Sequence, residues 1–141
     1  MNLIHCRVVT PHGVYREMDA SILNIPTTDG IQGILPEHMP LVTMLKIGEM
    51  TTVEDGQRRS YAIAGALFYF KDNVAEILTD AIEGKDEIDV ERAIRAKERA
   101  EKRLSSNDPN IDMKRAQAAL EKALTRLKVA GTANIQDYSK K

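Results

Sequence analysis

The sequence predicts an α+β protein in which an N-terminal antiparallel β-sandwich is followed by a two-helix antiparallel hairpin. Most β-branched and aromatic residues occur before residue 88, whereas Ala, Leu, Arg, Lys and Glu dominate after it, which is a change from strand formers to helix formers. The hexapeptide Ile88–Ala93 also returns in similar form as Ile111–Ala116, and each copy opens a run with helical spacing. We therefore expect three parts: a β-sandwich domain at 1–87, a helical hairpin at 88–131 and a tail at 132–141 whose polar, aperiodic sequence predicts disorder.

The first part contains short segments rich in Val, Ile, Thr and Tyr that are separated by turn signals such as residues 10–13 and 28–30. This spacing is typical of antiparallel strands packed as a sandwich or barrel. Residues 60–64 and 74–78 alternate in polarity, so each is expected to bury one face. Gly65 lies between two apolar runs and is expected to mark a bulge or a close backbone approach.

Each copy of the hexapeptide places an Asp where an N-cap carboxylate can accept hydrogen bonds from the first turn of a helix. The first helix is predicted from Asp89 to Leu104, and the turn formers that follow, with Pro109, reverse the chain. The second helix is predicted from Asp112 to Ala130, with Gly131 as its C-cap residue. The apolar stripes are narrow and alanine-rich, so the hairpin needs a partner or ligand for its stability.

Basic side chains form a row along each predicted helix. Such rows at three- and four-residue steps suit an anion, but acids on the same helices also allow a second interpretation, a solvated face laced with i,i+3 and i,i+4 ion pairs. The first row is Arg92, Arg95, Arg99 and Arg103, the second is Arg115, Lys122 and Arg126, and the acids are Glu91, Glu98, Glu101 and Glu121.

Charge separates the two parts of the chain. Residues 1–87 carry 7 Lys and Arg against 13 Asp and Glu, whereas residues 88–141 carry 13 against 8. A basic arm on an acidic body suits an acidic docking surface or a phosphorylated ligand. Cys6 is the only cysteine, and no apolar run is long enough to span a membrane, so we expect a cytosolic chain that meets the membrane only through a partner.

The motifs of common catalytic sites are missing from the sequence. There is no P-loop, and nothing in the sequence brings a nucleophile and a base together. His38 has no other histidine at metal-ligand spacing, because His5 and His12 lie far away in the sequence. We therefore expect no catalytic residue and no metal site.

Three motifs in one order carry a resemblance to a known family. They are Val9-Thr10-Pro11-x-Gly13, Gly33-Ile34-Leu35-Pro36-x-His38 and a helical hairpin that opens with Ile-Asp-x-x-Arg-Ala. Over about residues 3 to 131 the chain closely resembles the epsilon subunit of the bacterial F-type ATP synthase. The resemblance implies a non-catalytic sandwich at the foot of the rotor's central stalk, on the cytoplasmic face of the membrane. Its expected contacts with the gamma subunit and the c ring are Gly33, Ile34, Leu35, Pro36 and His38.

The resemblance also implies that the helical hairpin is a regulatory arm. Folded down it permits turnover, and extended along gamma it inserts among the beta and alpha subunits and blocks ATP hydrolysis. In relatives from bacilli the Ile/Leu-Asp-x-x-Arg-Ala motif binds ATP on the folded arm. Carried over by position, Glu83 and the backbone near Ile88 and Asp89 would hold the adenine and ribose end. Ala93 would leave room for the base, and Arg92, Arg99, Lys122 and Arg126 would surround the phosphates.

The expected ATP is a regulatory ligand, and no cofactor is required. Few groups here suit a metal, so binding should not need magnesium, and no side chain is placed to activate water. Lys122 stands where ATP-binding relatives often have Arg, and an ammonium in place of a bidentate guanidinium should weaken the site.

Two other hypotheses remain. In the first, the rotor role holds but the Ile-Asp-x-x-Arg-Ala motif only caps a helix, as the second copy with Asp112 and Arg115 suggests. In the second, the basic hairpin binds nucleic acid, which the acidic body and the lack of aromatic residues in the arm before Tyr138 oppose. We therefore expect no nucleic-acid partner.

Overall fold

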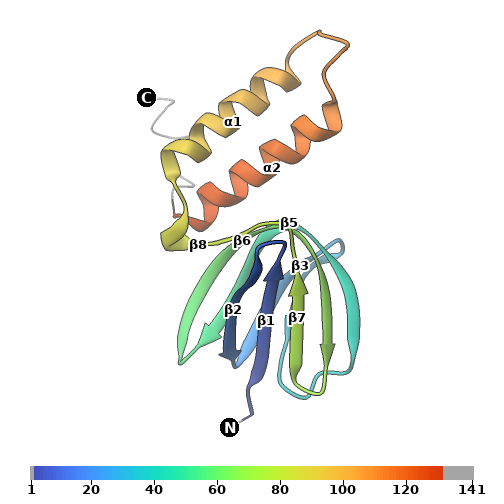
Figure 1. The fold of residues 1–141 in the computed structure, drawn as a ribbon, viewed down its shortest axis with the longest axis vertical. Coiled ribbons are helices and arrows are strands. Elements are labelled where there is room, and N and C mark those ends of the chain that lie inside the picture. Colours follow the sequence, from blue (N-terminus) through green and yellow to red (C-terminus); the bar gives the residue numbers. More distant parts are fainter. Residues whose placement is uncertain (1, 132–141) are drawn as a thin grey trace.

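The computed structural model describes residues 2–131, and these form a β-sandwich with a helical hairpin laid across one end (Figure 1). The predicted fold class is confirmed. The expected disorder of residues 132–141 lies outside the described residues. The elements, in chain order, are β1 (Ile4–Thr10), β2 (Gly13–Ala20), β3 (Ile22–Thr27), β4 (Gly30–Ile34), β5 (Leu41–Glu54), β6 (Gln57–Lys71), β7 (Val74–Leu78), β8 (Ile82–Gly84), the 3₁₀ turn η1 (Lys85–Glu87), α1 (Val90–Leu104) and α2 (Met113–Val129).

The strands follow the order β2-β1-β7-β6-β5-β3-β4, and β8 pairs with β6 beyond the end of β7. The long strands β5 and β6 pair along nearly their whole length and form the middle of this order. Neighbouring strands are antiparallel except β1 and β7, which pair in parallel. This one parallel pair was not expected, because strand signals alone do not fix which distant strands meet.

The core lies between the two layers, where alternate residues of the strands point inward. Phe68 and Phe70 are its largest fully buried side chains. The predicted alternation of residues 74–78 is confirmed, with Ala75 and Ile77 buried. Gly65 lies between the part of β6 that pairs with β8 and the part that pairs with β7. Its φ of 88° is a conformation that glycine adopts without a steric penalty, so the irregular backbone expected here is present.

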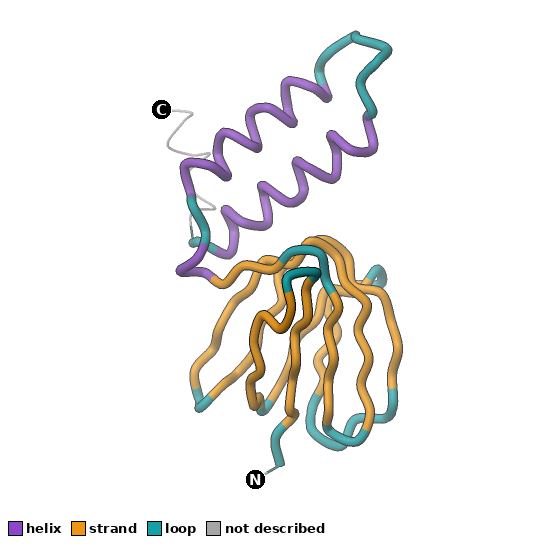
Figure 2. The backbone as a smooth tube through the Cα atoms, viewed as in Figure 1, coloured by secondary structure: helices purple, strands orange, loops and turns teal. Residues whose placement is uncertain are grey.

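The prediction that residues 60–64 bury one face is confirmed, but Ala62 on the opposite face is buried as well. Tyr61 and Ile63 point into the sandwich, whereas Ala62 points outward and packs with Ile88 and Val129. The hairpin therefore covers the outer face of β6 here, as Figure 2 shows for the backbone.

The two helices lie antiparallel and pack on each other through small residues. Ala93 and Ala100 of α1 are buried, as are Ala116 and Ala123 of α2. The second helix ends one residue earlier than predicted: Ala130 is its C-cap, and Gly131 follows with a φ of 80°. A glycine just beyond the C-cap adopts this left-handed backbone at no steric cost.

Candidate ligand site on the helical hairpin

Both hexapeptide copies cap a helix, as predicted. The Asp89 carboxylate accepts a hydrogen bond from the Arg92 backbone N–H at 3.1 Å. In the second copy, the Asp112 carboxylate accepts from Lys114 and Arg115 at 3.0 and 3.2 Å. Each carboxylate thereby satisfies donors that a helix start leaves free. Capping is a property of both copies, whether or not either one also binds a ligand.

Two ion pairs join α2 to the sandwich. Arg126 Nε donates to Glu83 Oε1 at 2.6 Å, and each side chain is only partly exposed. Lys128 Nζ lies 3.7 Å from Glu49 Oε1, with the lysine mostly in solvent. The first pair is therefore the stronger contact, since its short distance and partial burial both favour charge-assisted bonding.

Glu83, Lys122 and Arg126 line one small cavity between α2 and the outer face of β6. The space there is about 10 Å³, which is the room of one water molecule. Glu83 and Arg126, two of the residues expected to contact ATP, bond to each other in this conformation.

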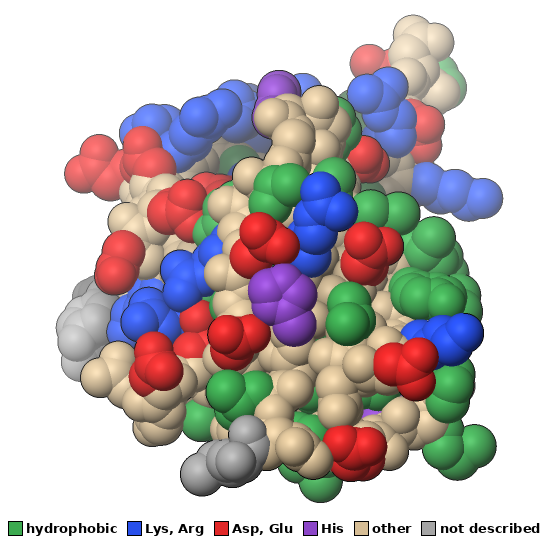
Figure 3. All heavy atoms as spheres, turned by 60° about the horizontal axis from the view of Figure 1, so that its bottom comes forward, with side chains coloured by type: hydrophobic (Ala, Val, Ile, Leu, Met, Phe, Trp, Pro, Cys, Tyr) green, Lys and Arg blue, Asp and Glu red, His purple; other side chains and the backbone are tan. Residues whose placement is uncertain are grey.

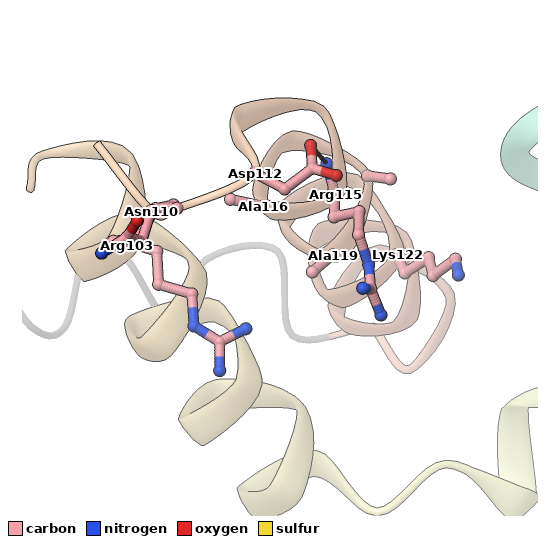
Figure 4. A pocket seen from close by; sticks show the side chains of 9 residues that line it. Arg103, Asn110, Asp112, Arg115, Ala116, Ala119 and Lys122 are labelled. Carbon is pink, nitrogen blue, oxygen red and sulfur yellow. Dashed lines mark hydrogen bonds between the residues drawn. The ribbon is translucent and has the colours of Figure 1, made fainter. Parts of the chain in front are cut away.

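A far larger cavity, of about 620 Å³, lies on the hairpin away from the first hexapeptide (Figure 4). Arg103 of α1 and Arg115 and Lys122 of α2 line it with the second hexapeptide's Asp112 and Ala116. This volume is within the range of small-molecule sites. None of these three cations makes an ion pair with another described residue. The cavity therefore has room and unneutralised positive charge.

The expected ATP contacts are thus only partly brought together. The structure joins Glu83, Lys122 and Arg126. Ile88 is buried under α2 and Ala93 between the helices, while Arg92 and Arg99 are exposed on α1. Sequence reasoning placed Arg103 and Arg115 in the basic rows but not in the site. The helical spacing of Arg103 and Arg115 could have indicated that they bind an anion. The cavity that they share could not be predicted, because it depends on how the two helices pack.

The interpretation of the basic rows as laced with ion pairs is wrong for the described helices, because the one ion pair within them uses a lysine outside both rows. Lys97 and Glu101 pair at 3.6 Å across one turn. Within residues 2–131, Arg92, Arg95 and Arg99 have no acidic partner within ion-pair distance. Most of the charge in the first row is therefore not neutralised by the hairpin itself.

The loop expected to contact the rotor lies at the end of the sandwich remote from the hairpin, between β4 and β5. Leu35 is 57% exposed and Met39 76% exposed, whereas Ile34 is fully buried in the core. Ile34 therefore cannot offer its side chain to a partner, because the inward register of β4 places it among the core residues. Gly33 is exposed, and Pro36 and His38 are partly exposed.

His38 is held by neighbouring groups within its own loop and strand β6. Its ring stands edge-on to Phe70 with centroids 5.9 Å apart, and Nδ1 lies 2.7 Å from the Met39 carbonyl oxygen. Among residues 2–131 no group of three or more His, Cys, Asp or Glu side chains could hold a metal ion. These contacts indicate that His38 stabilises the conformation of its own loop.

Apolar side chains also project from the outer face of three adjacent strands. Met44, Leu67 and Leu78 lie side by side across β5, β6 and β7, and Val42 pairs with Tyr69 in a neighbouring row. All five are exposed. Figure 3, which turns the end remote from the hairpin toward the viewer, shows hydrophobic side chains gathered along one side. Exposed apolar groups gathered in this way mark a contact surface.

Two family models together match almost all of the described chain. The β-sandwich domain of the ATP synthase delta/epsilon chain matches residues 3–85, and its long α-helix domain matches residues 86–131. The fold and the hairpin are therefore those of the delta and epsilon chains of ATP synthases.

The ATP synthase epsilon chain of Desulforamulus reducens is 43% identical over 123 residues, which are 87% of this chain and 93% of that relative. The epsilon chain of Caldicellulosiruptor bescii is 44% identical over 123 residues, which are 87% of this chain and 90% of that relative. The epsilon chain of Halalkalibacterium halodurans is 42% identical over 132 residues, which are 93% of this chain and 99% of that relative. This chain belongs to the family of ATP synthase epsilon chains.

Solved structures show the same fold. A chain of the Euglena gracilis mitochondrial ATP synthase superimposes with a TM-score of 0.78 at 24% identity, covering 91% of this chain and 81% of that one. A chain of the Tetrahymena thermophila mitochondrial ATP synthase central stalk and c ring superimposes with a TM-score of 0.57 at 16% identity. This match covers 92% of the present chain and 95% of that one. Within residues 2–131 the structure has no helix of the length and hydropathy of a membrane span.

Proposed function

We propose that this chain is a non-catalytic rotor subunit of an F-type ATP synthase, peripheral to the cytoplasmic face of the membrane, whose sandwich binds the gamma subunit and the c ring. The observation that carries this proposal is the exposed apolar face formed by Met44, Leu67 and Leu78 with Val42 and Tyr69. Burying such a face against another subunit removes apolar surface from water. Central-stalk neighbours of the same fold support the assignment.

The end loop supplies the second part of this contact surface. Gly33, Leu35, Pro36 and His38 lie at the end of the sandwich opposite the hairpin, which suits contact with the c ring. Ile34 acts from the core as the anchor of this loop, and Met39 adds the most exposed apolar side chain of the segment.

A substitution on the outer face tests the rotor role. Leu67→Asp should block assembly into ATP synthase that lacks this subunit, because an unpaired carboxylate would be buried in the interface. Ile31→Asp is the control, since Ile31 is also exposed but lies on the edge strand β4, outside the row that contains Leu67. Equal assembly of both variants would contradict the proposal.

The hairpin acts as a regulatory arm in this proposal. It lies folded against the sandwich through the Ala62, Ile88 and Val129 cluster and the Glu83–Arg126 pair. These few contacts suit an element with two positions. In the second position the arm extends along gamma, and its unneutralised arginines meet acidic surfaces of the beta and alpha subunits and inhibit ATP hydrolysis. Salt should weaken that docking.

ATP stabilises the folded arm as a regulatory ligand in the same proposal. Arg92, Arg99, Lys122 and Arg126 would meet the phosphates, and Glu83, Ile88, Asp89 and Ala93 the nucleoside. Support comes from the unneutralised arginines of α1 and from Lys122, which lines both hairpin cavities. A ligand that binds only the folded arm shifts the balance toward it.

Titration calorimetry of ATP into the full chain, with and without magnesium, tests this proposal. Saturable binding that is lost in the double variant Arg92→Ala, Arg126→Ala, and that needs no magnesium, is expected. The matched variant Arg103→Ala, Arg115→Ala removes the same charge from the large cavity. If ATP binding is lost only in this second variant, the nucleotide binds in the large cavity and the proposed site is wrong.

The competing hypothesis keeps the rotor role and makes the motif a helix cap. The cap hydrogen bonds at Asp89 and Asp112 favour it. It predicts no binding of ATP at millimolar concentration. It also predicts that Asp89→Asn, which keeps a capping oxygen, changes neither the helix nor the regulation.

A further inference from the structure

The exposed end loop contains a backbone conformation that its own sequence does not favour. The His38 N–H donates to the Leu35 carbonyl at 3.1 Å, which closes a turn over Pro36 and Glu37. Glu37 has a φ of 71°, in the left-handed region that glycine occupies without a steric penalty. A side chain there needs other contacts that hold it.

Asn73 supplies those contacts from a different turn, the one that joins β6 to β7. Its Oδ1 accepts from the Glu37 backbone N–H at 2.6 Å, and its Nδ2 donates to Glu37 Oε1 at 2.8 Å. Asn2 donates to the same Oε1 at 2.9 Å. The His5 N–H donates to the Asn73 carbonyl at 2.9 Å, so Asn73 is itself tied to β1. One side chain therefore fixes both the backbone and the carboxylate of Glu37.

We propose that Asn73 is a positioning residue that holds the Leu35–Pro40 turn in the form that binds the rotor partner. The turn places Leu35 and Met39 in solvent on either side of Glu37. If the Asn73 clamp is removed, the turn can relax from its left-handed residue and these two apolar side chains lose their fixed spacing. Binding then requires the partner to order the loop, which lowers affinity.

This inference rests on the proposed contact of the end loop with the rotor, so the experiment separates the two. The full chain carrying Asn73→Gly is the test variant, because glycine suits the φ of 62° at this position and removes only the side chain. Glu37→Gly removes the carboxylate contact of the clamp, keeps the backbone N–H contact and relieves the left-handed backbone. Met39→Ser alters the contact surface directly and leaves the clamp intact.

Two quantities are measured: hydrogen exchange of the Glu37 amide, and the affinity of each variant for ATP synthase purified without this subunit. Asn73→Gly is expected to speed exchange of that amide and to weaken binding about tenfold, which is the size of one charge-assisted hydrogen bond. In a Glu37→Gly background the same substitution should have a smaller effect, because only the Asn73 Oδ1 bond to the backbone N–H of residue 37 is then left to lose. Thermal unfolding reports whether the sandwich is intact.

Faster amide exchange with unchanged affinity in Asn73→Gly would overturn the positioning role and leave a local turn contact. A weakened Met39→Ser beside an unaffected Asn73→Gly would overturn the positioning role and keep the rotor contact. An unaffected Met39→Ser would overturn the loop's part in the proposed function. A loss of affinity in Asn73→Gly that persists in full in the Glu37→Gly background would also overturn the clamp, since it would show that Asn73 acts by another route.

Discussion

Arg126 on α2 and Glu83 on β8 form a 2.6 Å charge-assisted hydrogen bond that joins the arm to the sandwich. Both residues are also among the proposed ATP contacts. The docked arm therefore already uses two groups that the nucleotide would need. ATP binding and the Glu83–Arg126 pair should compete, unless the ligand replaces the contact that it breaks.

Glu83→Gln should loosen the docked arm. The change removes the ion pair and leaves the guanidinium with a weaker acceptor, at a loss of about 1 kcal/mol for a pair about one-third exposed. Hydrogen exchange of the Ala62 and Ile63 amides, beneath α2, should then be about fivefold faster. Lys128→Gln, which breaks the longer and more exposed pair with Glu49, should have a smaller effect. An equal effect of both variants would argue against a special role for Glu83.

Ile88→Ala should also release the arm, through packing. Ile88 is only 9% exposed and contacts the apolar cluster of Ala62 and Val129. Truncation of a buried isoleucine removes about 2 kcal/mol or more of packing free energy. Limited proteolysis at the η1 linker should accelerate, while the unfolding of the sandwich stays near that of the parent. Ile31→Ala, at an exposed position, is the control, and the same proteolysis rate in both variants would contradict this role of Ile88.

The fold could be predicted from the sequence because local signals agree with it. Turn residues separate the strands, and the Asp of each hexapeptide marks a helix start within one residue of its observed position. The burial of Ala62 could not be predicted, because polarity alternation describes one sheet face and says nothing of a helix packed on the other. The same limit applies to Ile34, whose motif indicated a contact loop although the side chain belongs to the core.

Less of the candidate site could be predicted from the sequence. The basic rows gave the residue types, but only the antiparallel packing of α1 and α2 brings Arg103 near Arg115 and Lys122. The Glu83–Arg126 pair joins residues 43 positions apart, and no local spacing indicates it. Asn73 lies in the turn between β6 and β7, and its bond to Glu37 depends on two turns that meet only in the folded sandwich.

Gly131→Ala should destabilise the end of α2. A Cβ there meets only the tip of Lys85 at ordinary contact distance, so the effect comes from the φ of 80°. We expect a loss of about 1 kcal/mol in the free energy of unfolding. Gly131→Asn should lose less, because asparagine tolerates this backbone. Thermal unfolding of the three chains gives the comparison, and identical curves would show that the helix end frays before the arm unfolds.

Acid should destabilise the sandwich through Glu54. This carboxylate is 4% exposed and accepts hydrogen bonds from Thr52, Tyr61 and Arg16 at 2.5, 2.7 and 2.7 Å. Burial alone raises the pKa of Glu54, but these three donors outweigh burial and hold the pKa below its usual value. The charged form is thus favoured in the folded state.

A carboxyl with a lowered pKa contributes stability above its unfolded pKa and loses it as the pH falls through the folded pKa. The free energy of unfolding should therefore decrease below about pH 4.5, the ordinary value for this group. Glu54→Gln should lower the free energy of unfolding by about 2 kcal/mol at neutral pH, because a neutral amide is a weaker acceptor than the carboxylate for the three donors. The variant should also show a shallower acid dependence than the parent. Urea unfolding at pH 3.5, 5 and 7 measures both effects, and parallel pH profiles of the two chains would exclude Glu54 as their origin.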